Sequence, residues 1–275
     1  MTMTTSVMTT GVELRSAADR ALTAAARFWF VVAVAGQWMF AYYVAAFYGG
    51  AAVQGNLQAW NKVLPHGHVP GDTMNNVAVA AHLFLAVIVI VGGPLQLIPQ
   101  IRRVAPSFHR WNGRLYLPAV VATSIAGLYM VWSRGTGEVV QHIGISLDAV
   151  LIIVFSALAL RYALARDFRT HRRWALRLFM VVNGVWFFRV GLMFWIAVNQ
   201  GPVGFDVKTF SGPFLDFLSF ADYLLPLAVL ELYLRTKDGA STQARFAMTA
   251  ALVILTLAMG LGIGVAAMGM WLPRI

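Results

Sequence analysis

The sequence has no cysteine among its 275 residues. This absence excludes disulfide bonds, thiolate metal sites and cysteine-ligated iron–sulfur clusters. Histidine, methionine and carboxylate side chains remain as possible metal ligands.

Charged residues are also scarce, because they make up 12% of the chain while hydrophobic residues make up 59%. A soluble domain of this size does not need so much apolar sequence, whereas each membrane helix needs roughly 20 apolar residues to cross about 30 Å of hydrocarbon. The apolar runs are continuous and do not alternate, which favours helices over a transmembrane barrel. The predicted fold class is therefore an all-α integral membrane protein.

The apolar runs predict about seven transmembrane helices. The predicted spans are residues 28–49, 76–99, 114–133, 140–162, 174–198, 213–234 and 246–271. We expect residues 28–272 to form a single transmembrane domain, and residues 1–27 to be a short amphipathic segment that precedes it rather than a cleaved signal peptide.

The net charge of +10 does not indicate nucleic acid, because the basic residues lie in short loops between apolar runs. Sixteen of the 21 Lys and Arg residues lie in residues 1–27 or in the loops near 102–114, 161–177 and 235–245, and four lie in the other loops. Cytoplasmic loops of membrane proteins are enriched in Lys and Arg. The N-terminus is therefore predicted to be cytoplasmic and the C-terminus outside.

A helical hairpin is duplicated in the middle of the chain. His109-Arg110-Trp111 and His171-Arg172-Arg173-Trp174 open two of the predicted spans, and each Trp is followed three residues later by an Arg. The Trp and Arg positions are 63 residues apart (174 − 111 and 177 − 114). The two hairpins, at about 76–133 and 140–198, are expected to form an antiparallel four-helix bundle.

Four histidines occupy matching depths in this predicted bundle. His82 and His142 are expected in the outer half, and His109 and His171 near the inner surface. Facing imidazoles at equal depth are what two bis-His b-type haems would require. The anionic propionates would then bind inner arginines, and small residues would make room for the macrocycles. These residues are Arg103, Arg110, Arg114, Arg172, Arg173 and Arg177, with Gly92, Gly93, Gly127 and Gly191 as the small residues.

Two resemblances follow from these residues. Gly92 to Gln96, Phe108 to Tyr116 and His171 to Arg177 resemble motifs of a bacterial multispanning family known as domain of unknown function 2306. Membership implies a bacterial inner-membrane location and no established activity. The histidine placement is also similar to that of two-haem transmembrane b-type cytochromes, which implies His82 and His142 on one haem and His109 and His171 on the other.

Ionisable residues also lie inside the predicted spans. Arg189 and Asp222 lie at similar depth and are expected to form a buried ion pair. Asp148 and Asp216, together with this pair, would line either a proton path or a polar cavity that opens outward. The alternative is a purely structural pair that fixes spans five and six together.

Three functions remain open from the sequence. The first is transmembrane electron transfer through haem b from a quinol or small reductant, which would make any enzyme activity that of a membrane oxidoreductase. The second is a transporter or lipid-binding protein whose basic residues contact anionic head groups of membrane lipid. The third is a structural subunit without a cofactor, and the sequence does not indicate an oligomeric state.

Overall fold

The computed structural model describes residues 2–134 and 137–275, and the side chains of residues 13–134 and 137–275. Helices make up nearly all of the regular structure in these residues. The α-helices are α1 (Thr2–Val44), α2 (Gly50–Val53), α3 (Thr73–Leu97), α4 (Pro99–Val104), α5 (Pro106–Arg134), α6 (Val139–Leu164), α7 (Phe168–Val182), α8 (Gly184–Asn199), α9 (Pro213–Gly239) and α10 (Thr242–Ala266). Asp72, Asp167 and Ser241 cap α3, α7 and α10, because each side chain accepts a hydrogen bond from a backbone N–H in the first turn.

Within the described residues, six helices are long and apolar enough to cross a membrane, and a seventh span results if α7 and α8 count as one broken helix. The predicted all-α membrane fold with about seven spans is confirmed. The helix of the first span is longer than predicted, because α1 runs without a break from Thr2 to Val44. Residues 2–27 are therefore helical and continuous with the first span, and their place on the cytoplasmic side of the membrane stays a prediction.

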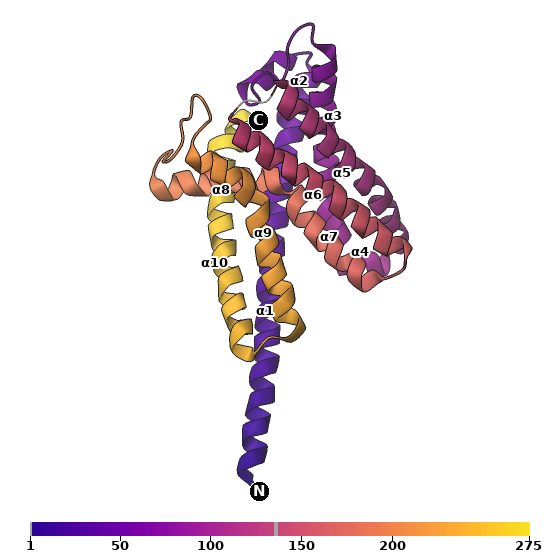
Figure 1. Ribbon diagram of the computed structural model, residues 1–275, viewed down its shortest axis with the longest axis vertical. Helices are drawn as coiled ribbons and strands as arrows, with labels where there is room; N and C mark the ends of the chain where they lie inside the picture. Colours follow the sequence, from indigo (N-terminus) through magenta and orange to yellow (C-terminus); the bar gives the residue numbers. More distant parts are fainter. Residues whose placement is uncertain (1, 135–136) are drawn as a thin grey trace.

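The helices form two groups that lie side by side (Figure 1). One group is the predicted four-helix bundle of α3, α5, α6 and α7, in which each helix packs on the next around the ring. The other group joins α1, α9 and α10, with α8 packed on α10 and α9. Figure 1 shows the two groups diverging toward the end where α4 and the α9–α10 turn lie. We call this end the basic end, because it holds the arginine-rich helix ends at residues 97–114, 161–177 and 235–245.

The first hairpin, α3 and α5, is closely packed because α3 contributes two adjacent glycines at the contact. A Cβ on Gly92 would lie 3.1 Å from Asn112 Oδ1, and one on Gly93 would lie 3.2 Å from the Tyr116 hydroxyl. The Asn112 side-chain amide also donates a hydrogen bond to the Gly92 carbonyl oxygen at 3.0 Å. The glycines thus let α5 approach the backbone of α3.

The second hairpin differs, because its returning helix is broken. The axes of α7 and α8 meet at an angle of 52° at Asn183, so the predicted continuous span 174–198 is wrong in its geometry. The buried Asn183 side chain donates to the Phe179 carbonyl oxygen at 2.7 Å, and Gly184 follows it. Asn and Gly both have low helix propensity, which explains the break at this position.

At the end opposite the basic end, an ion pair fixes the first hairpin to the preceding loop. Arg134, in the last turn of α5, contacts the Asp72 carboxylate at 2.5 Å and donates to the His66 carbonyl oxygen at 2.9 Å. The hydrogen bond from Arg134 lowers the pKa of Asp72 below its ordinary value, with further lowering by hydrogen bonds from Asn75. The loop before α3 is therefore held against the end of α5.

Candidate functional site

A large cavity lies between the two helix groups at the basic end. Its volume is about 2490 Å³, well above the range of roughly 300–1,000 Å³ that is usual for small-molecule sites. Both groups line it, from Trp29 and Phe30 of α1 to Leu117 of α5, Phe179 of α7 and Leu252 of α10. The cavity is therefore a product of the divergence of the two groups rather than a gap inside the four-helix bundle.

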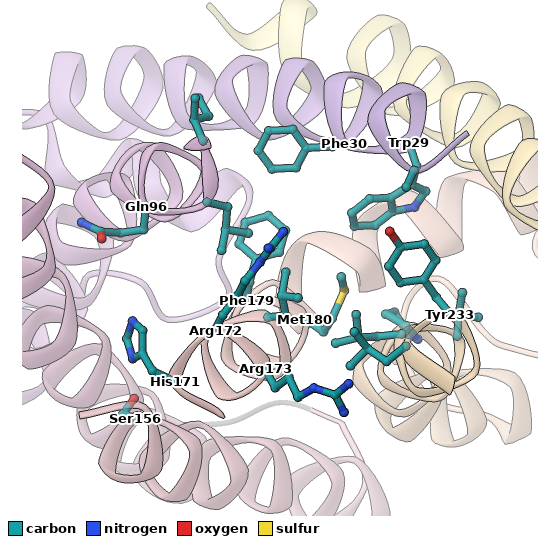
Figure 2. A pocket seen from close by; sticks show the side chains of 18 of the residues that line it. Trp29, Phe30, Gln96, Ser156, His171, Arg172, Arg173, Phe179, Met180 and Tyr233 are labelled. Atoms are coloured by element: carbon teal, nitrogen blue, oxygen red, sulfur yellow. The ribbon is translucent and has the colours of Figure 1, made fainter. Parts of the chain in front are cut away.

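The cavity has apolar walls and a basic rim. Figure 2 shows Trp29, Phe30, Phe179 and Met180 around its interior, and His171, Arg172 and Arg173 projecting into it from one turn of α7. The rim also includes Arg169 of α7 and cations from five other elements or loops, which are Arg27, Arg102, Arg110, Arg114, Arg166 and Lys237.

Some of the apolar wall residues keep a large accessible surface. Val31 of α1, Phe217 and Leu225 of α9 and Leu255 of α10 line the cavity and are 64%, 59%, 56% and 43% exposed. The cavity is therefore lined in part by large apolar side chains with much accessible surface, which an apolar ligand could cover.

The two inner histidines, His109 and His171, both line this cavity. The Nδ1 atom of His171 is 2.8 Å from the Ala159 carbonyl oxygen, which directs the other ring nitrogen, Nε2, away from α6. The Nδ1 atom of His109 is buried and has no hydrogen-bond partner, and the two imidazoles are close enough to interact electrostatically. The structure thus brings the inner pair to one site, as the duplication suggested.

Each histidine of the outer pair, His82 and His142, contacts α5. The Nδ1 atom of His82 is 3.0 Å from the Thr123 carbonyl oxygen, whereas the His142 ring lies edge-on to Trp132 with centroids 5.5 Å apart. Their joint binding of a haem therefore stays a prediction, for which these contacts offer no support.

The six predicted propionate-binding arginines separate into three kinds. Arg110, Arg114, Arg172 and Arg173 line the cavity, although Arg173 also forms an ion pair with Asp238. Arg177 does not line it, because its guanidinium binds both oxygens of Glu231 at 2.6 and 2.9 Å. Arg103 is exposed and outside the cavity lining. Arg103 and Arg177 therefore lie apart from the four arginines that line the cavity, and propionate binding by these residues stays a prediction.

Protein atoms occupy the space beside the glycines that were expected to face a macrocycle. Gly92 and Gly93 face Asn112 and Tyr116, as described above. A Cβ on Gly127 would lie 3.3 Å from the His82 ring, and one on Gly191 would lie 3.3 Å from Leu218. These glycines serve helix packing, so the interpretation that they make room for haem is a mistaken one.

The predicted Arg189–Asp222 ion pair is not formed among the described residues. The Arg189 guanidinium instead donates to the Val185 carbonyl oxygen at 3.0 Å and lies 5.2 Å from the centre of the Phe40 ring. The bend at Asn183 turns α8 away from the bundle, which carries Arg189 toward α1. Arg189 and Asp222 lie at equal depth by residue count, but they are not in contact because α8 is tilted.

The carboxylates of the predicted polar path also separate. Asp216, in the first turn of α9, accepts a hydrogen bond from Gln141 at 3.2 Å. Asp222 lies further along α9, lines the cavity and interacts electrostatically with Asp148 of α6. The polar site that contains Asp222 therefore opens into the cavity at the basic end, which corrects the expected outward opening.

Four residues that sequence reasoning missed help to build this region. Gln96 donates to the His109 backbone carbonyl at 3.1 Å, and Ser156 lines the cavity with a buried hydroxyl that has no partner. Tyr223 and Gly184 lie beside Asp148. Two of them had a sequence signal, because Gln96 ends the Gly92 to Gln96 motif and Asn-Gly within an apolar span marks a helix break.

These features define a multispanning helical membrane protein with an amphipathic cavity at its arginine-rich end. Residues 79–211, from α3 to the loop before α9, match the family model described as predicted membrane protein (DUF2306). The resemblance expected from the Gly92 and His109 motifs is confirmed over this segment. No curated protein and no solved structure matches the chain.

Proposed function

We propose that this protein binds an amphiphile with an anionic head group, of the class of phosphate-bearing membrane lipids, in the cavity at its basic end. The single observation behind the proposal is the combination of apolar walls and a cationic rim in one cavity of about 2490 Å³. A long apolar chain fits the walls, and a phosphate fits the rim.

The rim supports this proposal because some of its cations have no carboxylate partner. Among the described residues, Arg172 forms no ion pair, Arg110 donates a hydrogen bond to Ser107, and Arg114 lies over the Trp111 ring. A bidentate arginine–phosphate contact is stronger than a contact between neutral groups. Unpaired guanidinium groups at the entrance of an apolar cavity therefore favour an anionic ligand.

We further propose that the basic end faces the cytoplasm of a bacterial cell, because 16 of the 21 Lys and Arg residues belong to that side. The head group would then come from the inner leaflet. Since the chain lacks cysteine, Thr209→Cys and Ser241→Cys report the orientation: a membrane-impermeant maleimide added to intact cells should label the former and spare the latter.

The binding experiment compares two charge-matched variants. In nanodiscs, Arg110→Gln with Arg172→Gln removes two cavity cations, whereas Arg103→Gln with Arg161→Gln removes two exposed cations of the same end that do not line the cavity. We expect the Kd for a phosphatidate to rise at least about tenfold in the first variant, because each charged hydrogen bond contributes about 1.5–3 kcal/mol.

The control variant should bind the phosphatidate with a Kd close to that of the wild-type protein, and phosphatidylcholine should bind each protein more weakly. Equal weakening in both variants would mean that the lipid responds only to the general surface charge. That result would overturn the proposal of a cavity site.

A second function is favoured by one specific observation, which is the presence of His109 and His171 in the same cavity. The hydrogen bond from His171 to Ala159 leaves Nε2 as the available ligand atom, as is common for metal-binding histidines. His109 and His171 would hold haem b, with Arg110, Arg114 and Arg172 near the propionates, and the group would supply one-electron transfer to a quinol-type partner. A visible spectrum of the purified protein before and after dithionite distinguishes the two proposals, since only haem gives a reducible Soret band that His171→Ala abolishes.

A further inference from the structure

Three buried polar groups converge where the second hairpin is broken. Asp148 of α6 is 9% exposed, and its Oδ2 atom lies 2.7 Å from the position that a Cβ on Gly184 would occupy. Tyr223 of α9 is fully buried, with its Cβ 3.6 Å from the same position. Asp222 precedes Tyr223 and acts electrostatically on it, as does Asp148.

Each of the three groups has a buried polar atom without a hydrogen-bond partner. These atoms are Asp148 Oδ1, Asp222 Oδ1 and the Tyr223 hydroxyl. Buried polar atoms are nearly always satisfied in folded proteins, so three unpartnered atoms at one place indicate something that they share. The Tyr223 hydroxyl is independent of the two acids and points to the same conclusion.

The surrounding helices bring no cation to this site among the described residues. On α7, Arg177 is paired with Glu231 of α9, and on α10, Arg245 is paired with Asp19 of α1. On α8, Arg189 is directed to Phe40. The remaining acidic group near this face of α9, Asp216, is bound by Gln141.

Two neighbouring carboxyls without a cation cannot both be ionised in a membrane interior. We propose that Asp148 and Asp222 form a proton-binding site at the α7–α8 break, in which the pair shares one proton and exchanges it through the cavity. The proton belongs to the pair rather than to one residue, since the two groups titrate together. Because Asp222 lines the cavity and Asp148 does not, Asp222 is the carboxyl that meets incoming protons.

The site also connects protonation to the geometry of the break. Asp148 fills the notch that the absent side chain of Gly184 leaves between α6 and α8. Removal of the shared proton leaves one negative charge on α6 and one on α9, and their repulsion favours separation of these two helices. The proton-binding test uses protein without added lipid, so its outcome does not depend on the lipid proposal.

Reaction with dicyclohexylcarbodiimide tests the proposal, because this apolar reagent modifies protonated carboxyls. The acid proton goes to a carbodiimide nitrogen, the carboxylate oxygen adds to the central carbon, and rearrangement gives a stable acylurea with no leaving group. Peptide mass spectrometry of detergent-purified protein should find this adduct on Asp222 at about pH 7, where exposed carboxyls are ionised. Asp216 and Glu231, on the same helix, should stay unmodified.

Two variants sharpen the test. Asp222→Asn should lose the adduct, and Asp148→Asn should move the labelling curve of Asp222 to lower pH by at least about one unit, because the like charge is removed. Asp216→Asn is the matched control and should leave the curve unchanged. If Asp148→Asn does not elute as a folded protein, Asp148→Ser takes its place. If neither Asp148 variant folds, the test rests on the labelling of Asp222 in the wild-type protein and its loss in Asp222→Asn.

Three results would overturn the proposal. They are the absence of an Asp222 adduct between about pH 5 and pH 9, equal labelling of Asp216, and a labelling curve that Asp148→Asn or Asp148→Ser does not move. Loss of labelling when sodium replaces potassium in the buffer would assign the pair to sodium ions and would equally contradict a proton site.

Discussion

The two hairpins began as copies of one sequence pattern, and they differ in their returning helices. In the first hairpin α5 continues for 29 residues to Arg134, whereas in the second the chain bends by 52° between α7 and α8. At the 63-residue spacing of the repeat, Asn183 and Gly184 correspond to Val120 and Val121. Two residues of low helix propensity thus lie at the break in the second hairpin, where the unbroken α5 of the first hairpin has two β-branched residues.

The same difference bears on where the cavity and the Asp148–Asp222 pair lie. The first hairpin is closed by glycine packing near its basic end and by the Asp72–Arg134 ion pair at the other. The second hairpin loses this symmetry because α8 leaves the bundle and packs on α10 and α9. The displaced Arg189 follows from that departure, and the buried acidic pair lies near the break. Residues of both hairpins line the cavity, because it lies between the two helix groups.

The largest expected effect concerns the hinge itself. Gly184→Leu places a side chain where Asp148 lies, so we expect it to reduce the free energy of unfolding by about 3 kcal/mol. The equivalent change in the first hairpin, Val121→Leu, should cost less than about 1 kcal/mol. Denaturation in mixed detergent micelles measures both.

A double variant identifies the cause of the Gly184→Leu loss. If the clash with Asp148 is responsible, Asp148→Ala should recover a large part of the stability in the Gly184→Leu background. If Gly184→Leu and Val121→Leu reduce the free energy of unfolding equally, the packing at the break is no tighter than the packing at the equivalent position of the first hairpin.

An intermediate effect is expected at the equivalent arginines, Arg177 and Arg114. Arg177 binds both oxygens of Glu231, whereas Arg114 lies over the Trp111 ring at 4.9 Å. We expect Arg177→Ala to cost about 2 kcal/mol, because a partly buried carboxylate loses its partner. Arg114→Ala should cost less than about 1 kcal/mol. The same denaturation assay compares them, and a larger loss for Arg114→Ala would contradict the assignment of Arg177 to a structural pair.

The smallest effect is the pH dependence of the Asp72–Arg134 pair, which only the first hairpin has. The pKa of Asp72 is lowered in the folded state, so the pair stabilises the fold above the ordinary carboxyl pKa, and this stabilisation is lost as the pH falls through the lowered value. The Tm of the wild-type protein should therefore decrease more on acidification than that of Asp72→Asn.

Thermal unfolding in detergent at a series of pH values provides the measurement. Glu138→Gln, which alters another exposed carboxyl at the same end, serves as the control and should keep the wild-type slope. Parallel curves for wild-type protein and Asp72→Asn would show that the pair does not contribute to stability.

Much of the fold could be predicted because hydrophobic length and basic loops act over whole segments. The spans, the duplication and the bundle of α3, α5, α6 and α7 all derive from such patterns. The site could be predicted only in part. His109, His171, Arg110, Arg114, Arg172 and Arg173 were expected at one site and line the cavity, because matching positions in two copies of a hairpin lie at matching depths.

The errors came from residues whose position depends on how a helix is tilted. Arg189 and Asp222 have equal depth in the sequence, yet the bend at Asn183 directs Arg189 to Phe40 and leaves Asp222 beside Asp148. Likewise, the glycines expected to face a haem face Asn112, Tyr116, His82 and Leu218. Depth along a membrane helix follows from counting residues, but the direction of a side chain around the helix axis does not.

By itself, the sequence determined that the chain crosses a membrane several times and that its cations gather at one end, because burial in hydrocarbon and the cost of charge there depend on composition and order alone. Only the tertiary structure decided that two helix groups diverge around a cavity and that Asp148 meets Asp222 at a broken helix. Those outcomes depend on packing between residues far apart in the chain, where the absence of one side chain at Gly184 sets how closely two helices approach.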